Sequence, residues 1–148
     1  MIQIEELSNT EINLILSRVG YGHLACSRDD QPYVVPVHYA FVDGQIFIYT
    51  TEGKKFEIIR VNPLVCLQVE EVTDNQHWTS VIVEGVAEQI TNPAEREKAV
   101  KLVVAVNPTL APAISIRWMD NWVRENIEVV YRVTSTATSG RRTVNKTQ

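Results

Sequence analysis

The chain has 148 residues and a formal net charge of −4, and 45% of its residues are hydrophobic. This length suits one domain whose core needs no disulfide or metal, and the residue balance is ordinary for a soluble globular protein. A net negative charge argues against a generic nucleic-acid-binding protein, which needs a basic surface. We assign residues 1–134 to a single domain and residues 135–148 to a polar C-terminal tail.

The sequence predicts a cytoplasmic protein. Its N-terminal residues lack a basic stretch followed by an apolar one, so we expect no signal peptide. No apolar run reaches the roughly 18 residues that a membrane span needs. The two cysteines, Cys26 and Cys66, lie in apolar, strand-like segments without zinc-type Cys-His spacing. We therefore interpret them as reduced core residues and expect no metal site.

The first half of the chain is predicted to form a helix followed by three strands. Ser8 and Glu11 have capping-box spacing before an apolar run, which predicts a helix over 9–18. A strand then begins with "GYGHLACS", and Asp43-Gly44 joins two β-rich runs over 31–51 as a two-residue hairpin loop. That loop sets the register, with Val42 opposite Gln45, His38 opposite Tyr49, Val37 opposite Thr50 and Pro36 opposite Thr51.

This register gives the hairpin two different faces, because side chains alternate along a strand. One face is apolar and suits the core. The other carries His38, Ala40, Phe47 and Tyr49, and it suits a flat ligand or a second subunit. Because such a patch is too apolar to be left to water, we expect a homodimer that buries it. Pro36 lacks an N–H group, so we expect a bulge or an open edge at that point.

The second half alternates between strands and helices. We predict a helix over 52–61, strands over 64–73 and 77–90, a helix from Asn92-Pro93 to about residue 106, and a last strand over 127–135. Residues 108–126 are interpreted as a loop and a short helix. Six short strands with few helices predict a mainly β fold, a small antiparallel barrel with helices at its openings.

The junction "YTTEGKKFEIIRVNP" has the chemistry of an anion site. The first N–H groups of the predicted helix have no intrahelical partners, and the helix dipole adds positive charge there. Thr50 and Thr51 add hydroxyl groups, Gly53 lets an oxygen approach the backbone, and Lys54 and Lys55 add full charges. Such a site suits a phosphate. The alternative is a capped surface helix with two solvated lysines.

Other polar residues give weaker signals. The three histidines stand apart from any metal-ligand spacing, and His38 is either a general base or a partly buried structural histidine. No nucleophile motif is present, so the catalytic residues stay unassigned. The three tryptophans are either core and interface anchors or stacking partners for a flat ring; they are Trp78, Trp118 and Trp122.

Four segments taken in order resemble a known family. They are "GYGHLACS", "PYVVPVHYAFVDGQIFIYT", "GKKFEIIRVNPLVCLQVEE" and "WTSVIVEGVAEQI". Their ordered set is similar to the pyridoxamine 5'-phosphate oxidase-like family of FMN-binding split barrels, in the branch of the 5-nitroimidazole-resistance proteins. The resemblance covers about residues 12–90 and is weak beyond residue 107.

The resemblance implies a six-stranded antiparallel split barrel that binds FMN at a homodimer interface. It implies that the strand-to-helix junction holds the FMN phosphate and that the backbone of the proline-containing strand reads the ring edge. Trp78 and Ser80 would close the pocket. The implied cofactor-binding residues are Pro36, Val37, His38, Thr50, Thr51, Lys54, Lys55, Trp78 and Ser80.

The resemblance also implies an oxidoreductase, in which FMN passes electrons from a reduced nicotinamide or similar donor to a small organic acceptor. Where the nitroimidazole-resistance branch carries His-Ser, this chain has Tyr49-Thr50. The hydroxyl survives that change, but the missing histidine argues against reduction of nitroimidazoles. The alternatives are a flavin-binding protein without catalysis and a split barrel that binds haem or deazaflavin.

Overall fold

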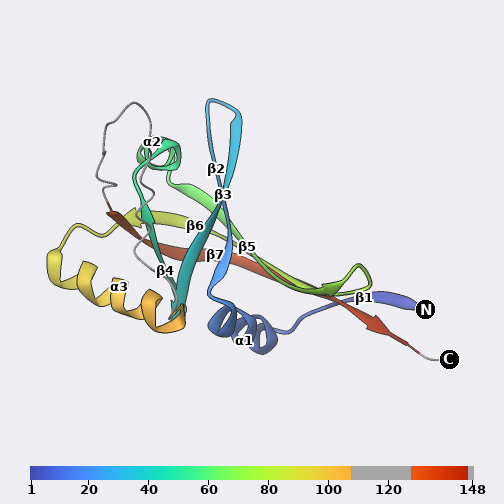
Figure 1. Cartoon of the computed structure of the whole chain (residues 1–148). Helices are drawn as coiled ribbons and strands as arrows, with labels where there is room; N and C mark the ends of the chain where they lie inside the picture. The colour runs from blue at the N-terminus through green and yellow to red at the C-terminus, as the bar shows by residue number, and fades with distance from the viewer. Residues whose placement is uncertain (108–127, 147–148) are drawn as a thin grey trace, which may run out of the picture.

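The computed structural model describes residues 1–107 and 128–146 (Figure 1). Residues 108–126, predicted as a loop and a short helix that carry Trp118 and Trp122, lie outside the described residues. Three helices and seven strands follow one another in this order: β1 (Ile2–Glu6), α1 (Asn9–Val19), β2 (Tyr21–Arg28), β3 (Gln31–Val42), β4 (Gln45–Thr51), α2 (Lys54–Val61), β5 (Leu64–Asp74), β6 (His77–Gln89), α3 (Pro93–Val106) and β7 (Glu128–Asn145).

The strands form one antiparallel sheet in the order β1-β7-β4-β3-β2-β5-β6, and a further pairing of β6 with β7 closes it into a barrel. The predicted antiparallel barrel is therefore confirmed, but the sheet has seven strands instead of six. The additional strand, β1, pairs with the far end of β7. Its residues are almost all exposed, so no alternation between apolar and polar residues marks it in the sequence.

The predicted polar tail at 135–148 is wrong for most of its length, because β7 continues to Asn145. Its second half pairs with β1 on one edge and with β6 on the other. The polar residues there stay on a mostly exposed ribbon, which explains why they look like a tail in the sequence. Gly140 is the buried exception: a Cβ atom there would lie 2.7 Å from the Leu7 side chain.

The helices begin and end close to the predicted residues. Ser8 and Glu11 form the expected capping box at the start of α1, and Asn92 caps α3 with Pro93 in its first turn. Helix α2 begins at Lys54, two residues later than predicted. None of the helices within residues 1–107 and 128–146 is long and apolar enough to cross a membrane.

The hairpin of β3 and β4 has the predicted register from Val42 opposite Gln45 to His38 opposite Tyr49. Its inner face is the core, where Tyr39 and Ile48 are fully buried. Its outer face is covered by α3 from the same chain: Phe47 and Tyr49 pack with Ala99 in a second apolar cluster. The expectation that a second subunit covers this face is therefore wrong at Phe47 and Tyr49, which α3 covers.

The two cysteines are free and lie on adjacent strands, β2 and β5. Cys26 is buried on the inner face of β2, whereas Cys66 is only partly buried on the outer face of β5. Because their side chains leave opposite faces of one sheet, they cannot form a disulfide with each other without moving the backbone.

Candidate functional site

The pairing of β3 with β4 stops at His38 and Tyr49, whereas β3 pairs with β2 all the way to Gln31. The predicted pairs of Val37 with Thr50 and of Pro36 with Thr51 are absent from the ladder. Pro36 supplies a physical reason, because it has no N–H group to donate. The two strands separate at this point, as the expected open edge at Pro36 requires.

This separation leaves backbone groups of β3 without a strand partner. The Tyr39 N–H group donates to the Gly20 carbonyl on the β2 side. Because neighbouring residues of an antiparallel strand bond to opposite sides, the backbone groups of Val34 and Pro36 point toward β4. The Pro36 carbonyl and the Val34 N–H group therefore face the opening. We call this opening, between residues 34–36 and the start of α2, the β3–α2 split.

The start of α2 is open for an anion. Its N-cap residue, Gly53, has no side-chain capping bond, so the first N–H groups of the helix have no capping acceptor within the described residues. A Cβ atom at Gly53 would meet nothing within 4 Å, and the φ of 171° is extended backbone that any residue adopts. The fold therefore does not require glycine there. What glycine provides is unobstructed access of a ligand to the first N–H groups of α2.

The two lysines of the first turn point in different directions. The Lys54 ammonium lies 4.9 Å from the centre of the Tyr33 ring of β3, so this side chain spans the β3–α2 split. Lys55 is partly buried, and this burial lowers the pKa of its ammonium group, although a nearby Cys26 thiolate would raise that pKa. A bound anion would favour the charged form of Lys55 by supplying an opposite charge.

The two predicted threonines are divided between the faces of β4. Ile46 and Ile48 point into the core, so the alternation places Thr50 on the inner face and Thr51 on the outer face. Both are half-buried and pair with β7, opposite Val129 and Glu128. A phosphate on one side of the strand can therefore meet one of these hydroxyl groups directly, not both.

The three predicted ring-contact residues of β3 also alternate. The Val37 side chain is buried in the core at 3% exposure, so only its backbone can face a ligand. Pro36 is exposed and His38 is half-buried. His38 Nδ1 lies 3.1 Å from Oδ1 of Asn107, the residue that ends α3. Sequence reasoning missed Asn107, because it lies 69 residues from His38 in the chain.

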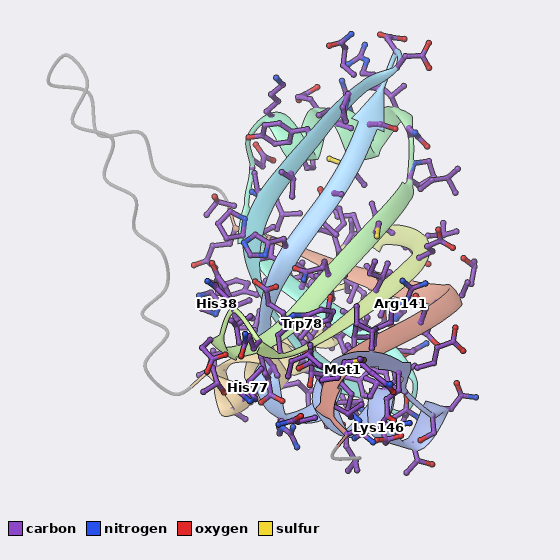
Figure 2. The ribbon with its side chains drawn as sticks, turned by 90° about the vertical axis from the view of Figure 1, so that its right-hand side faces the viewer. Met1, His38, His77, Trp78, Arg141 and Lys146 are labelled. Atoms are coloured by element: carbon purple, nitrogen blue, oxygen red, sulfur yellow. The ribbon has the colours of Figure 1, made fainter. Side chains whose placement is uncertain are left out.

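Trp78 and Ser80 lie away from the other predicted site residues. Both are on β6, which is separated from β3 by β2 and β5, or roughly 14 Å at the usual strand spacing. Figure 2 shows Trp78 beside His77 at the start of β6. The Ser80 hydroxyl accepts a hydrogen bond from Gln68 Nε2 at 3.2 Å. Within one chain, these residues do not close the β3–α2 split.

Two buried tyrosines lie inside the barrel. The Tyr39 hydroxyl donates to the Leu16 carbonyl at 2.8 Å, and burial raises its pKa. The Tyr131 hydroxyl has no hydrogen-bond partner within the described residues, and burial raises the pKa of Tyr131 to about 12. Both phenols are therefore neutral near pH 7 and carry no charge into the core.

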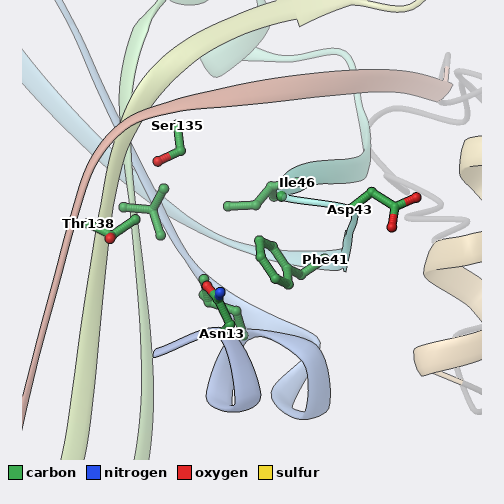
Figure 3. Close-up of a pocket in the computed structure, with 9 residues that line it drawn as sticks. Asn13, Phe41, Asp43, Ile46, Ser135 and Thr138 are labelled. Carbon is green, nitrogen blue, oxygen red and sulfur yellow. The ribbon is translucent and has the colours of Figure 1, made fainter. Parts of the chain in front are cut away.

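A pocket of about 380 Å³ lies at the α1 end of the barrel, away from the predicted site residues (Figure 3). Phe41 and Ile46 point into it from the hairpin, whereas the Asp43 carboxylate points away. A smaller pocket of about 220 Å³ lies on the outer face of the sheet, between Tyr21 and Val72. No predicted site residue lines either pocket.

Comparison with known proteins gives the family. A family model described as pyridoxamine 5'-phosphate oxidase matches residues 8–142, which include β2 to β6 and most of β7. The chain belongs to the pyridoxamine 5'-phosphate oxidase family. The resemblance over residues 12–90 is thereby confirmed, and the match extends through most of β7.

Solved structures support the split-barrel fold of this family. A FAD-binding protein from Mesorhizobium loti has a TM-score of 0.77 and 31% identity, covering 98% of this chain and 100% of that one. A proposed 5-nitroimidazole antibiotic resistance protein from Bacteroides thetaiotaomicron has a TM-score of 0.72 and 17% identity, covering 99% and 93%. The latter likeness shows the fold alone.

A curated relative is also similar over part of the chain. An uncharacterized protein of Rhizobium meliloti (strain 1021) is 37% identical over 82 residues, which are 55% of this chain and 54% of that protein. The matched region therefore spans about half the length of this curated relative.

Proposed function

We propose that the chain binds FMN at the β3–α2 split and acts as an oxidoreductase. The observation that carries the proposal is the open edge of β3 opposite an uncapped helix start with two lysines. The N–H groups of α2 with Lys54 or Lys55 would hold the phosphate. The Val34 N–H group would face the carbonyl oxygens at the polar edge of the ring, beside Pro36.

FAD is the second candidate, because the 31% identical Mesorhizobium loti protein is described as FAD-binding. The described residues favour FMN, since the start of α2 offers one cluster of N–H groups and cations. One such cluster suits one phosphate, whereas the pyrophosphate of FAD would need further donors.

The flavin, when bound, supplies hydride or electron transfer, and the protein positions and tunes it. The chain's own residues at the split are hydrogen-bonding and cationic groups. We therefore propose that most protons of the reaction are exchanged with solvent.

We also propose a homodimer, now on a different surface. The outer face of β2, β5 and β6 exposes Tyr21 (44%), Val72 (59%) and Ile82 (41%), and Trp78 and Ser80 lie on the same face by alternation. A second copy on this face would bury the apolar groups in the commonest closed assembly.

The experiment is to identify the bound cofactor. The purified protein is denatured, and the released small molecule is identified by chromatography and mass. FMN at about one per chain is the expected result, FAD would support the second candidate, and the absence of affinity for any flavin would overturn the proposal. Turnover with reduced nicotinamide and a panel of acceptors then separates an oxidoreductase from a flavin-binding protein without catalysis.

A further inference from the structure

The side-chain amide of Asn107 has only one possible orientation. One of its terminal atoms lies 3.3 Å from the Tyr39 carbonyl oxygen and 3.0 Å from the Val103 carbonyl oxygen. Two carbonyl oxygens accept hydrogen bonds and cannot donate them, so this terminal atom must be the amide nitrogen. The other terminal atom is therefore the oxygen Oδ1.

The orientation of Asn107 sets the tautomer of His38. Oδ1 of Asn107 can only accept, and His38 Nδ1 lies 3.1 Å from it, so Nδ1 must carry the proton. In a neutral imidazole, one ring nitrogen donates and the other accepts. His38 Nε2 therefore has a lone pair available, and within the described residues no hydrogen-bond partner contacts it.

Packing holds this pair in place from two further sides. A Cβ atom at Gly20 would lie 3.1 Å from the amide atoms of Asn107 and 2.6 Å from Val106, so the glycine lets the end of α3 approach β2 and β3. The Tyr21 ring lies 5.5 Å from the His38 ring at an angle of 60°. The imidazole is thus held between the end of α3 and an aromatic ring.

We propose that His38 Nε2 accepts a hydrogen bond from the imide N3–H of the flavin, and that Asn107 is the positioning residue that fixes His38 as an acceptor. This inference rests on the proposed function. His38 lies two residues from Pro36 on the same strand, so its Nε2 can add an acceptor at the polar ring edge. The imide N–H is the one donor of that edge, and an acceptor with a fixed lone pair complements it.

The first test reads the tautomer directly by NMR. The chain has three histidines, so the ring nitrogens of a ¹⁵N-labelled sample give few signals, and the His38→Phe variant identifies those of His38. With a neutral ring, Nδ1 should be the protonated nitrogen in wild type, and Asn107→Ala should populate both tautomers. Protonation of Nε2 as the main form in wild type would overturn the role of Asn107.

The second test measures affinity for FMN and for N3-methylated FMN, which lacks the imide proton. One neutral hydrogen bond corresponds to a change in Kd of about 2- to 12-fold. Wild type should bind FMN more tightly than N3-methyl FMN by this factor, and His38→Phe should bind the two alike. Addition of FMN should also move the Nε2 resonance of His38 while that of Nδ1 stays.

The outcomes separate the two proposals. FMN binding with an unchanged Nε2 resonance, or the same preference for FMN over N3-methyl FMN in His38→Phe as in wild type, would overturn the inference and leave the proposed function standing. The absence of binding of any flavin would overturn both. Thermal unfolding of His38→Phe and Asn107→Ala checks that each variant is folded before its affinity is interpreted.

Discussion

Lys54 and Lys55 are neighbours on the first turn of α2, but the fold gives their charges different surroundings. The Lys54 ammonium lies over the Tyr33 ring on the far side of the β3–α2 split. Lys55 is partly buried, and burial lowers its pKa. Neighbours on a helix point about 100° apart, so the two lysines cannot contribute equally to the binding of one phosphate.

We predict that Lys55→Ala lowers the affinity for FMN by roughly 10- to 150-fold. The variant removes one charge-assisted hydrogen bond to the phosphate, worth about 1.5–3 kcal/mol. Affinity for riboflavin, which has the same ring and no phosphate, should change little. Fluorescence titration with both ligands measures the effect.

Lys54→Ala is the matched control for this experiment. A smaller loss for Lys54→Ala is the expected result, because its ammonium is exposed and lies against an aromatic ring. Equal losses for FMN and riboflavin in Lys55→Ala would mean that the variant acts through folding. Unchanged FMN affinity in both variants would support a solvated helix start without a phosphate.

Tyr39 and Tyr131 form a natural pair for a second experiment. Both phenols are buried, but only Tyr39 has a hydrogen-bond partner within the described residues. We predict that Tyr39→Phe lowers the free energy of unfolding by about 0.5–1.5 kcal/mol. Tyr131→Phe should raise it by about 1 kcal/mol, because a buried hydroxyl without a partner costs about 1–3 kcal/mol.

Denaturant unfolding of the two variants and the wild type measures both changes. Opposite signs are the expected result. If Tyr131→Phe loses as much stability as Tyr39→Phe, the Tyr131 hydroxyl has a partner, such as an ordered water molecule, and the explanation fails.

At the scale of elements, the two halves of β7 pair with different strands. Its first half pairs with β4 and lines the core with Val129 and Val133. Its second half pairs with β1 and with residues 79–84 of β6. Arg142 also forms ion pairs with Glu5 and Glu11, and so connects β7 with β1 and α1.

We predict that a chain ending at residue 134 does not fold cooperatively, whereas a chain ending at residue 146 does. The shorter chain loses the β7 residues that pair with β1 and most of the β7 residues that pair with β6. This loss opens the core at Val81 and Val83, which are fully buried. Thermal unfolding followed by circular dichroism distinguishes the two chains. A sharp unfolding transition in the shorter chain would restore the view of residues 135–148 as a tail.

At the scale of the whole molecule, the fold moves the expected dimer surface away from the β3–β4 hairpin. Helix α3 covers the outer face of the β3–β4 hairpin within one chain, whereas the outer face of β5 and β6 has no covering element within the described residues and exposes Val72 and Ile82. An assembly would therefore use the latter face, which carries Trp78 and Ser80 as well.

We predict a homodimer in sedimentation experiments at micromolar concentration with FMN present, and its loss in Ile82→Asp. A charge on a buried interface has no partner and opposes association. Val104→Asp is the control, because Val104 is an exposed valine (37%) of α3, the helix that packs on the β3–β4 hairpin and not on β5 or β6. A monomeric wild type would contradict the dimer, and dissociation by both variants would place the interface elsewhere.

The sequence by itself determined the parts of the fold whose signals are local. The capping box at Ser8, the Asp43-Gly44 loop and the Asn92-Pro93 helix start each use neighbouring residues, and the hairpin register follows from its loop as far as His38. The residues proposed for the phosphate could also be named, because they lie within one short segment, Thr50 to Lys55.

Only the tertiary structure decided the features that depend on distant segments. β1 and the second half of β7 are polar and exposed, so they become strands only through pairing with each other and with β6. Asn107 meets His38 because α3 packs on the outer face of the hairpin, 69 residues away in the chain. Trp78 and Ser80 are separated from the split by the order of the strands, which hydrophobic periodicity does not encode.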